Sequence, residues 1–156
     1  MKRKALLVML VLLLLGAGQA FAYKAAIGGE FGLNVAGGLP NSALLSFRLP
    51  KFPPVIGLGV SIPETGSASA AVLLDWWLYQ GNLVSFINYY VGPGLYLQVG
   101  DSVSAGLRVP VGLNAFPIPP LELFVEFAPA VGFLAPTGVS IPDWGLQAGF
   151  GFRFWF

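Results

Sequence analysis

Apolar and polar positions alternate along much of this chain. In the stretch 121–133, every odd position is apolar, whereas the even positions carry Glu, Phe, Ala or Gly. The stretches 23–35, 101–116 and 144–156 repeat the pattern. A period of two is the signature of a β-strand, because successive side chains point to opposite faces. The pattern predicts strands with one apolar face and one small or polar face.

Turn-forming residues divide the chain into pieces of strand length. Clusters rich in Gly, Pro, Asn, Asp and Ser lie at 37–41, 50–54, 63–67, 80–82, 100–102, 117–120 and 136–143. These residue types tolerate or fix the dihedrals that turns need. The gaps are short, which suits antiparallel hairpins rather than helical crossovers. The spacing therefore predicts eight antiparallel strands.

The first 22 residues have the features of a secretory signal peptide. Lys2, Arg3 and Lys4 precede the apolar run Ala5–Leu15, and Ala20-Phe21-Ala22 forms an A-x-A cleavage signal. We expect a signal peptide at 1–22 and a barrel domain at 23–156; an uncleaved anchor is the alternative. The chain has no Cys, so neither a disulfide nor a lipid-modified cysteine can form.

Composition indicates which face of the strands points outward. The chain is 56% hydrophobic and only 10% charged, against about 25% charged in ordinary soluble domains. A soluble lipocalin-type barrel would need more charge on its outer surface, whereas a membrane barrel has an apolar exterior and a polar interior. Backbone groups in lipid must be paired, so the sheet must close, and eight strands leave an interior filled by side chains. We predict an all-β, eight-stranded antiparallel up-and-down transmembrane β-barrel.

A helical membrane protein is the competing interpretation. The stretch Trp76–Gly100 contains no charged residue over 25 positions, which a hydropathy scan would mark. It also contains Gly92-Pro93-Gly94, and Gly and Pro at that density weaken a helix. Strands are favoured here as well.

The chain resembles the small outer-membrane β-barrels of the OmpA, OmpX and OmpW type. The resemblance is most specific in the final strand, where Phe152, Phe154 and Phe156 alternate up to the terminal aromatic residue. In such barrels this C-terminal pattern is read by the barrel-assembly machinery. The stretch Leu121–Val131 also resembles a group of spirochaetal outer-membrane barrels. The resemblance implies the outer membrane of a diderm bacterium as location, with outer-membrane lipid and the assembly machinery as partners.

Aromatic residues are expected near both rims of the barrel, because their amphipathic rings favour membrane interfaces. Trp76, Trp77 and Phe116 join Tyr23 near the rim that carries the chain termini, and Trp144 lies near the opposite rim. Trp155 is expected to point inward as a plug at the mouth. The alternative is that aromatic residues are simply good strand formers.

Four charged residues on the polar faces predict an ion-pair network inside the barrel. Hairpin geometry around Pro117 places Arg108 opposite Glu126, and the next hairpin brings Arg153 beside Glu126 or Glu122. The network either staples the interior, which we favour, or forms a constriction that selects solutes.

No catalytic site, cofactor or metal site is expected, because the chain has neither His nor Cys. With five cationic and seven anionic residues after position 22, the chain lacks the basic patch of a nucleic-acid-binding protein. The predicted function is a structural or small-solute passage role in the outer membrane. Alternatives are an OmpW-like carrier of small apolar molecules, with inward Tyr90, Tyr96 and Phe124 lining a cavity, or a surface receptor or adhesin, which short loops disfavour.

Overall fold

The computed structural model describes residues 25–37, 39–49, 51–63, 66–134 and 143–156. The expected signal peptide, the girdle residue Tyr23 and the turn at 136–142 lie outside these residues. The described strands are β1 (Ala26–Gly37), β2 (Asn41–Leu49), β3 (Phe52–Ile62), β4 (Ser69–Asp75), β5 (Tyr79–Val84), β6 (Ile87–Val91), β7 (Gly94–Val99), β8 (Val103–Arg108), β9 (Val111–Ile118), β10 (Leu121–Leu134) and β11 (Asp143–Trp155). No described helix has the length and apolarity needed to cross a membrane.

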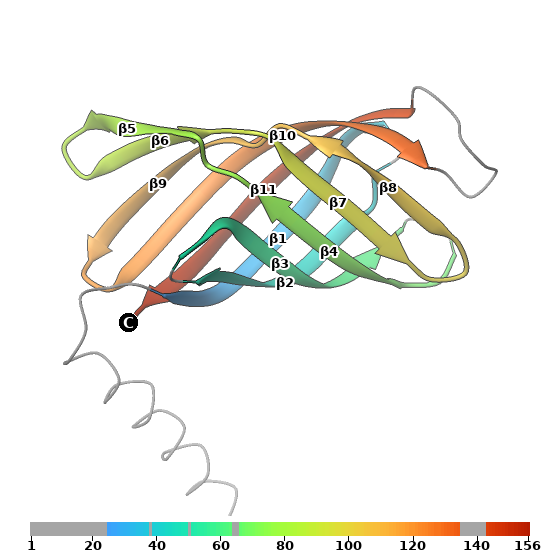
Figure 1. Ribbon diagram of the computed structural model, residues 1–156, viewed down its shortest axis with the longest axis horizontal. Coiled ribbons are helices and arrows are strands. Elements are labelled where there is room, and N and C mark those ends of the chain that lie inside the picture. Colours follow the sequence, from blue (N-terminus) through green and yellow to red (C-terminus); the bar gives the residue numbers. More distant parts are fainter. Residues whose placement is uncertain (1–24, 38, 50, 64–65, 135–142) are drawn as a thin grey trace, which may run out of the picture.

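The strands close into one antiparallel barrel (Figure 1). Around the ring the order is β11-β1-β2-β3-β4-β7-β8-β10, and β10 pairs back to β11. The last strand also pairs with the first, from Ala26 opposite Trp155 to Gly37 opposite Gly145. The prediction of an all-β, eight-stranded antiparallel barrel is therefore confirmed.

Three of the eight barrel strands are each broken into two segments, which explains why eleven strands are described. β4 continues as β5, β6 continues as β7, and β8 continues as β9. The second and third breaks fall at Gly92-Pro93 and Val109-Pro110, where proline removes a backbone donor. A Cβ on Gly92 would lie 1.6 Å from the Trp76 carbonyl oxygen, so only glycine allows the two backbones to approach there.

Beyond the breaks, β5, β6 and β9 extend as a sheet at the end of the barrel that carries the C-terminus (Figure 1). β5 pairs with β6 alone, so its other edge has no strand partner among the described residues. The turn expected at 80–82 is wrong, because these residues lie within β5 and the chain reverses at Ser85-Phe86. Asn82 instead supports that reversal: its Nδ2 donates to the Ser85 carbonyl at 2.8 Å.

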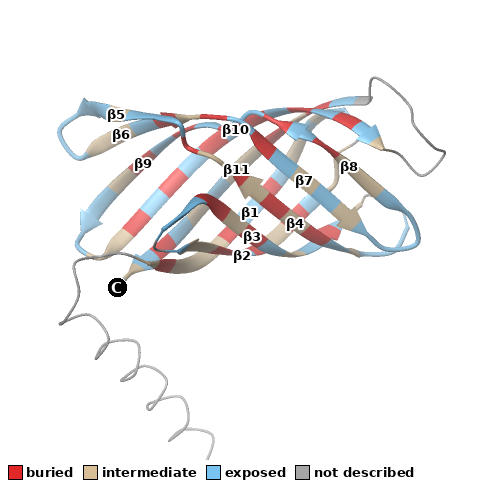
Figure 2. Cartoon of the chain, viewed as in Figure 1, coloured by how far each residue is buried: buried red, intermediate tan, exposed pale blue. Residues whose placement is uncertain are grey.

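The apolar faces of the strands point out of the barrel. Buried and exposed residues alternate along β10 and β11 in Figure 2. On β10, Val125 and Phe127 are 54% and 59% exposed, whereas Glu126 between them is only 4% exposed. This is the reverse of a soluble protein, in which the apolar face lines the core. The stretch Trp76–Gly100, the basis of the helical alternative, forms β5, β6 and β7.

Candidate functional site

The interior of the barrel holds two groups of side chains, each centred on a buried arginine. The first, the Arg108 cluster, consists of Arg108, Asp75, Glu126, Tyr90 and Gln147. Arg108 Nε lies 3.3 Å from Asp75 Oδ1, and Arg108 Nη2 forms an ion pair with Glu126 Oε1. Tyr90 donates its hydroxyl to Glu126 Oε2 at 2.7 Å. Since these residues come from β8, β4, β10, β6 and β11, the cluster ties together strands that are distant around the ring.

The second group, the Arg153 cluster, consists of Arg153, Glu122, Glu30 and Ser46. Arg153 Nη1 lies 3.4 Å from Glu122 Oε2, Arg153 Nη2 lies 3.9 Å from Glu30 Oε2, and Arg153 Nε donates to Ser46 Oγ at 2.9 Å. Its guanidinium also lies over the Phe124 ring, 3.9 Å from the centroid. Arg153 is 1% exposed, so every partner meets it in a dry environment where electrostatic interactions are strong.

The structure brings together the four residues of the predicted ion-pair network, but one predicted register is wrong. Arg153 lies directly opposite Glu122 on neighbouring strands. Arg108, expected opposite Glu126, instead pairs with Ala130, and Glu126 pairs with Gly112. The offset arises because the chain turns at Pro119-Pro120, with Ile118 opposite Leu121, and not around Pro117. The register of Val111 opposite Phe127 continues unchanged across the strand break to Arg108 opposite Ala130. The Arg108 side chain still reaches Glu126 across the interior.

Two acids that complete the network, Glu30 and Asp75, were not assigned to it from the sequence. Both lie on the small or polar side of their strands, yet their partners come from strands that no hairpin argument places beside them. Carboxylate oxygens of Glu30, Asp75 and Glu126 lie within 4.8 Å of one another, close enough to hold a metal ion. Arg108 forms ion pairs with Asp75 and Glu126, so two of the three carboxylates have a cationic partner without a metal.

Aromatic rings fill the space around the two clusters. Trp77 stacks on Tyr90 with ring centroids 3.7 Å apart, and Trp77 is buried. It was expected in the aromatic girdle at the rim that carries the chain termini, which is wrong: the ring points into the lumen, because Trp77 continues the inward alternation of Leu73 and Asp75. Trp155 points inward as predicted, and its Nε1 donates to Glu122 Oε2 at 2.8 Å.

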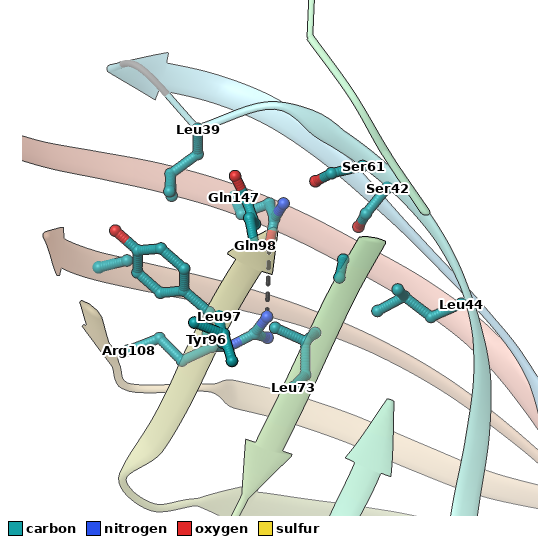
Figure 3. Close-up of a pocket in the computed structure, with 12 residues that line it drawn as sticks. Leu39, Ser42, Leu44, Ser61, Leu73, Tyr96, Leu97, Gln98, Arg108 and Gln147 are labelled. Atoms are coloured by element: carbon teal, nitrogen blue, oxygen red, sulfur yellow. Dashed lines mark hydrogen bonds between the residues drawn. The ribbon is translucent and has the colours of Figure 1, made fainter. Parts of the chain in front are cut away.

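A small cavity lies between the Arg108 cluster and the end of the barrel opposite the C-terminus (Figure 3). Its volume is about 10 Å³, at the lower limit of what one water molecule needs. Ser42 and Ser61 line it with buried hydroxyls that lack a hydrogen-bond partner among the described residues. Figure 3 also shows the Arg108 guanidinium donating to Gln147, at 3.3 Å. This cavity is therefore too small for an organic solute.

The other predicted site residues lie mainly on the outer surface. Phe152, Phe154 and Phe156 are exposed and follow one another down the outward face of the last strand and the residue after it. Trp144 is exposed near the start of β11, at the end of the barrel opposite the C-terminus, and Trp76 is half-buried at the first strand break. Phe116 has a different setting, because it lines the mouth of the lumen and its ring centroid lies 6.3 Å from that of Trp155.

Comparisons with known proteins add nothing to this description: no protein family, curated protein or solved structure matches the chain.

Proposed function

We propose that this chain is an integral outer-membrane β-barrel with a mainly structural role, whose lumen is closed by its own side chains. The carrying observation is the inverted distribution of polarity. Apolar residues cover the outward faces of the strands, and the buried polar residues include Arg108, Arg153 and four acids. Lipid is the solvent that favours such an exterior, because it has no groups to hydrogen-bond with polar side chains.

The predicted signal peptide at 1–22 and the terminal Phe row support export and assembly in the outer membrane. Phe152, Phe154 and Phe156 remain on the outside of the closing strand, where a partner can reach them. We propose that the assembly machinery binds this strand before the β1–β11 seam closes. A chain truncated before Phe152 should then accumulate outside the outer-membrane fraction, whereas unchanged fractionation would contradict this role.

Planar-bilayer conductance tests whether the lumen is closed. Because side chains of the two arginine clusters and the Trp77–Tyr90 stack fill the interior, we expect no channel steps above those of a protein-free bilayer. Stable unitary steps from the wild-type protein would contradict a closed lumen and favour small-solute passage instead.

Small-solute passage is the second candidate, and one observation bears on its selectivity. Four buried acids face only two fully buried arginines in the described interior, and rings of carboxylates favour cations. If the barrel conducts, the reversal potential in a KCl gradient should therefore indicate a preference for K⁺. The alternative of a carrier for apolar molecules has less support, because Tyr90 and Phe124 are packed against neighbours rather than around a cavity.

A further inference from the structure

A polar vestibule opens at the end of the lumen that carries the C-terminus. Its volume is about 380 Å³, within the range of small-molecule sites. Amide side chains from β5, β6 and β9 form one side, and Phe116 and Trp155 form an aromatic wall. Arg48, near the end of β2, is the cation in this lining. Unlike the cavity above the Arg108 cluster, the vestibule is large enough for an organic solute.

The guanidinium of Arg48 has no carboxylate partner. It forms no hydrogen bond or ion pair with any described residue, although Arg108 and Arg153 each have several. Instead it lies over the ring of Trp77, 4.6 Å from the centroid, and beside Trp155 at 5.6 Å. A cation–π contact holds the plane of the guanidinium without using its N–H donors. Arg48 is thus positioned with its hydrogen-bonding capacity unused.

The acid at this end of the lumen is already occupied. Glu122 Oε1 accepts a hydrogen bond from Asn114 at 2.7 Å, and Oε2 accepts one from Trp155 while pairing with Arg153. The other three buried acids gather deeper in the barrel. Arg153 is thus compensated by Glu122 and Glu30, and Arg48 is the one charged residue among the described residues that line the vestibule. An uncompensated cation at the mouth favours an incoming anion.

The rest of the lining supplies groups that recognise hydroxyls. Asn88 accepts a hydrogen bond from Asn82, which leaves its own amide N–H donors without a described partner. Gln80 donates to the Trp77 carbonyl, which leaves its side-chain oxygen as an acceptor. The aromatic wall offers a surface for the C–H face of a saturated ring. An inorganic anion alone would pair with Arg48 and make no contact with these amide groups or with the aromatic wall.

We propose that the vestibule binds small polyhydroxylated carboxylates, the chemical class of the sugar acids. The carboxylate pairs with Arg48, the hydroxyls bond to Asn88 and Gln80, and the ring packs against Trp155. Guanidinium–carboxylate pairs are often bidentate and strong, so the carboxylate contributes most of the affinity. This inference goes beyond the structural role proposed above and does not depend on it, since binding is measured on the barrel in detergent.

Calorimetric titration of the full chain in detergent, with glucuronate as the probe, tests the proposal. We expect glucuronate to bind at least about tenfold more tightly than glucose, the value of one hydrogen bond to a charged group. Arg48→Met should weaken glucuronate binding by a similar factor, and Arg48→Lys less. Lys51→Met is the matched control, because it removes a nearby exposed charge outside the vestibule and should leave binding unchanged.

Three results would overturn the proposal. Equal binding of glucose and glucuronate would remove the role of the charge. Inorganic phosphate binding as tightly as glucuronate would remove the role of the amides and rings. Unchanged binding by Arg48→Met would place the site elsewhere. The comparison of glucuronate with glucose needs no variant, so it decides the matter even if Arg48→Met fails to fold. Absence of glucuronate binding would leave the conductance prediction for a closed lumen unaffected.

Discussion

Arg153, on the closing strand β11, contacts side chains from three other strands in the interior of the barrel. It pairs with Glu122 and Glu30, donates to Ser46 and covers the ring of Phe124. Removing one partner of a buried charge network is costly, because the remaining charges lose their compensation. The arrangement therefore holds β11 to β10 and β2 through side chains as well as through the backbone.

Arg153→Leu should lower the free energy of unfolding by roughly 3–5 kcal/mol, because it leaves the buried Glu122 and Glu30 without a cation. Urea unfolding of the barrel in detergent, followed by tryptophan fluorescence, measures the change. Phe152→Leu is the control, since it alters the neighbouring outward side chain. If Arg153→Leu unfolds at the same urea midpoint as the wild-type protein, the network does not stabilise the barrel.

A double-variant cycle isolates the direct pair. Adding Glu122→Gln to Arg153→Leu removes the orphaned charge as well, so the double variant should regain part of the lost stability. Strict additivity of the two changes would mean that Arg153 and Glu122 do not interact.

At the scale of the strands, the seam between β1 and β11 depends on a close approach of backbones. A Cβ built on Gly28 would lie 1.7 Å from the carbonyl oxygen of Phe152, whereas one on Gly29 would meet only the Phe152 ring, at 3.3 Å. A ring can shift where a paired backbone cannot. This pair of adjacent glycines therefore offers a matched test of the closure.

Gly28→Ala should destabilise the barrel by roughly 1–3 kcal/mol, the usual cost of forcing a backbone shift in a packed site, and Gly29→Ala should have little effect. The fraction of unheated protein that keeps the compact gel mobility measures closure. Equal behaviour of the two variants would contradict the described seam.

The hairpin of β5 and β6 depends on Asn82, whose side-chain amide donates to the carbonyls of Ser85 and Ile87. Asn82→Ala should cost about 1 kcal/mol locally and speed amide hydrogen exchange in residues 79–91 by roughly fivefold. Ser104→Ala, which removes a hydrogen bond at the far end of the barrel, is the control. Unchanged exchange in the hairpin would show that Asn82 does not support it.

At the scale of the whole molecule, the turn clusters predicted the number of barrel strands and their antiparallel order. The alternation of apolar and polar residues predicted the face that carries the charges. Strand breaks were less predictable, because Gly92-Pro93 is as typical of a turn as of an interruption within a strand. Hairpin geometry predicted the ion pairs of Arg108 with Glu126 and of Arg153 with Glu122, but it could not predict contacts between strands that no hairpin joins. The pairing of Arg108 with Asp75 depends on the curvature of the closed sheet, which no local sequence pattern records.

The vestibule escaped sequence reasoning for the same reason. Arg48, Asn88 and Trp155 lie on three different strands, and only closure of the barrel gathers them at one mouth. The alternation pattern could have indicated that these side chains point inward, since each residue lies on the polar or inward side of its strand. What was missing was the position of each strand along the barrel axis.

If the barrel spans a membrane as proposed, its outward apolar face contacts lipid. The chain has no Cys, so single cysteines at Leu123, Val125 and Phe127 on β10, and at Ser102 in a turn, can each carry one nitroxide label. In reconstituted vesicles, electron paramagnetic resonance reports collision with oxygen, which concentrates in lipid, and with a water-soluble nickel chelate. We expect the labels at the three β10 sites to collide with oxygen and to be shielded from nickel, whereas the label at Ser102 is open to nickel. Nickel access at Val125 and Phe127 equal to that at Ser102 would contradict it.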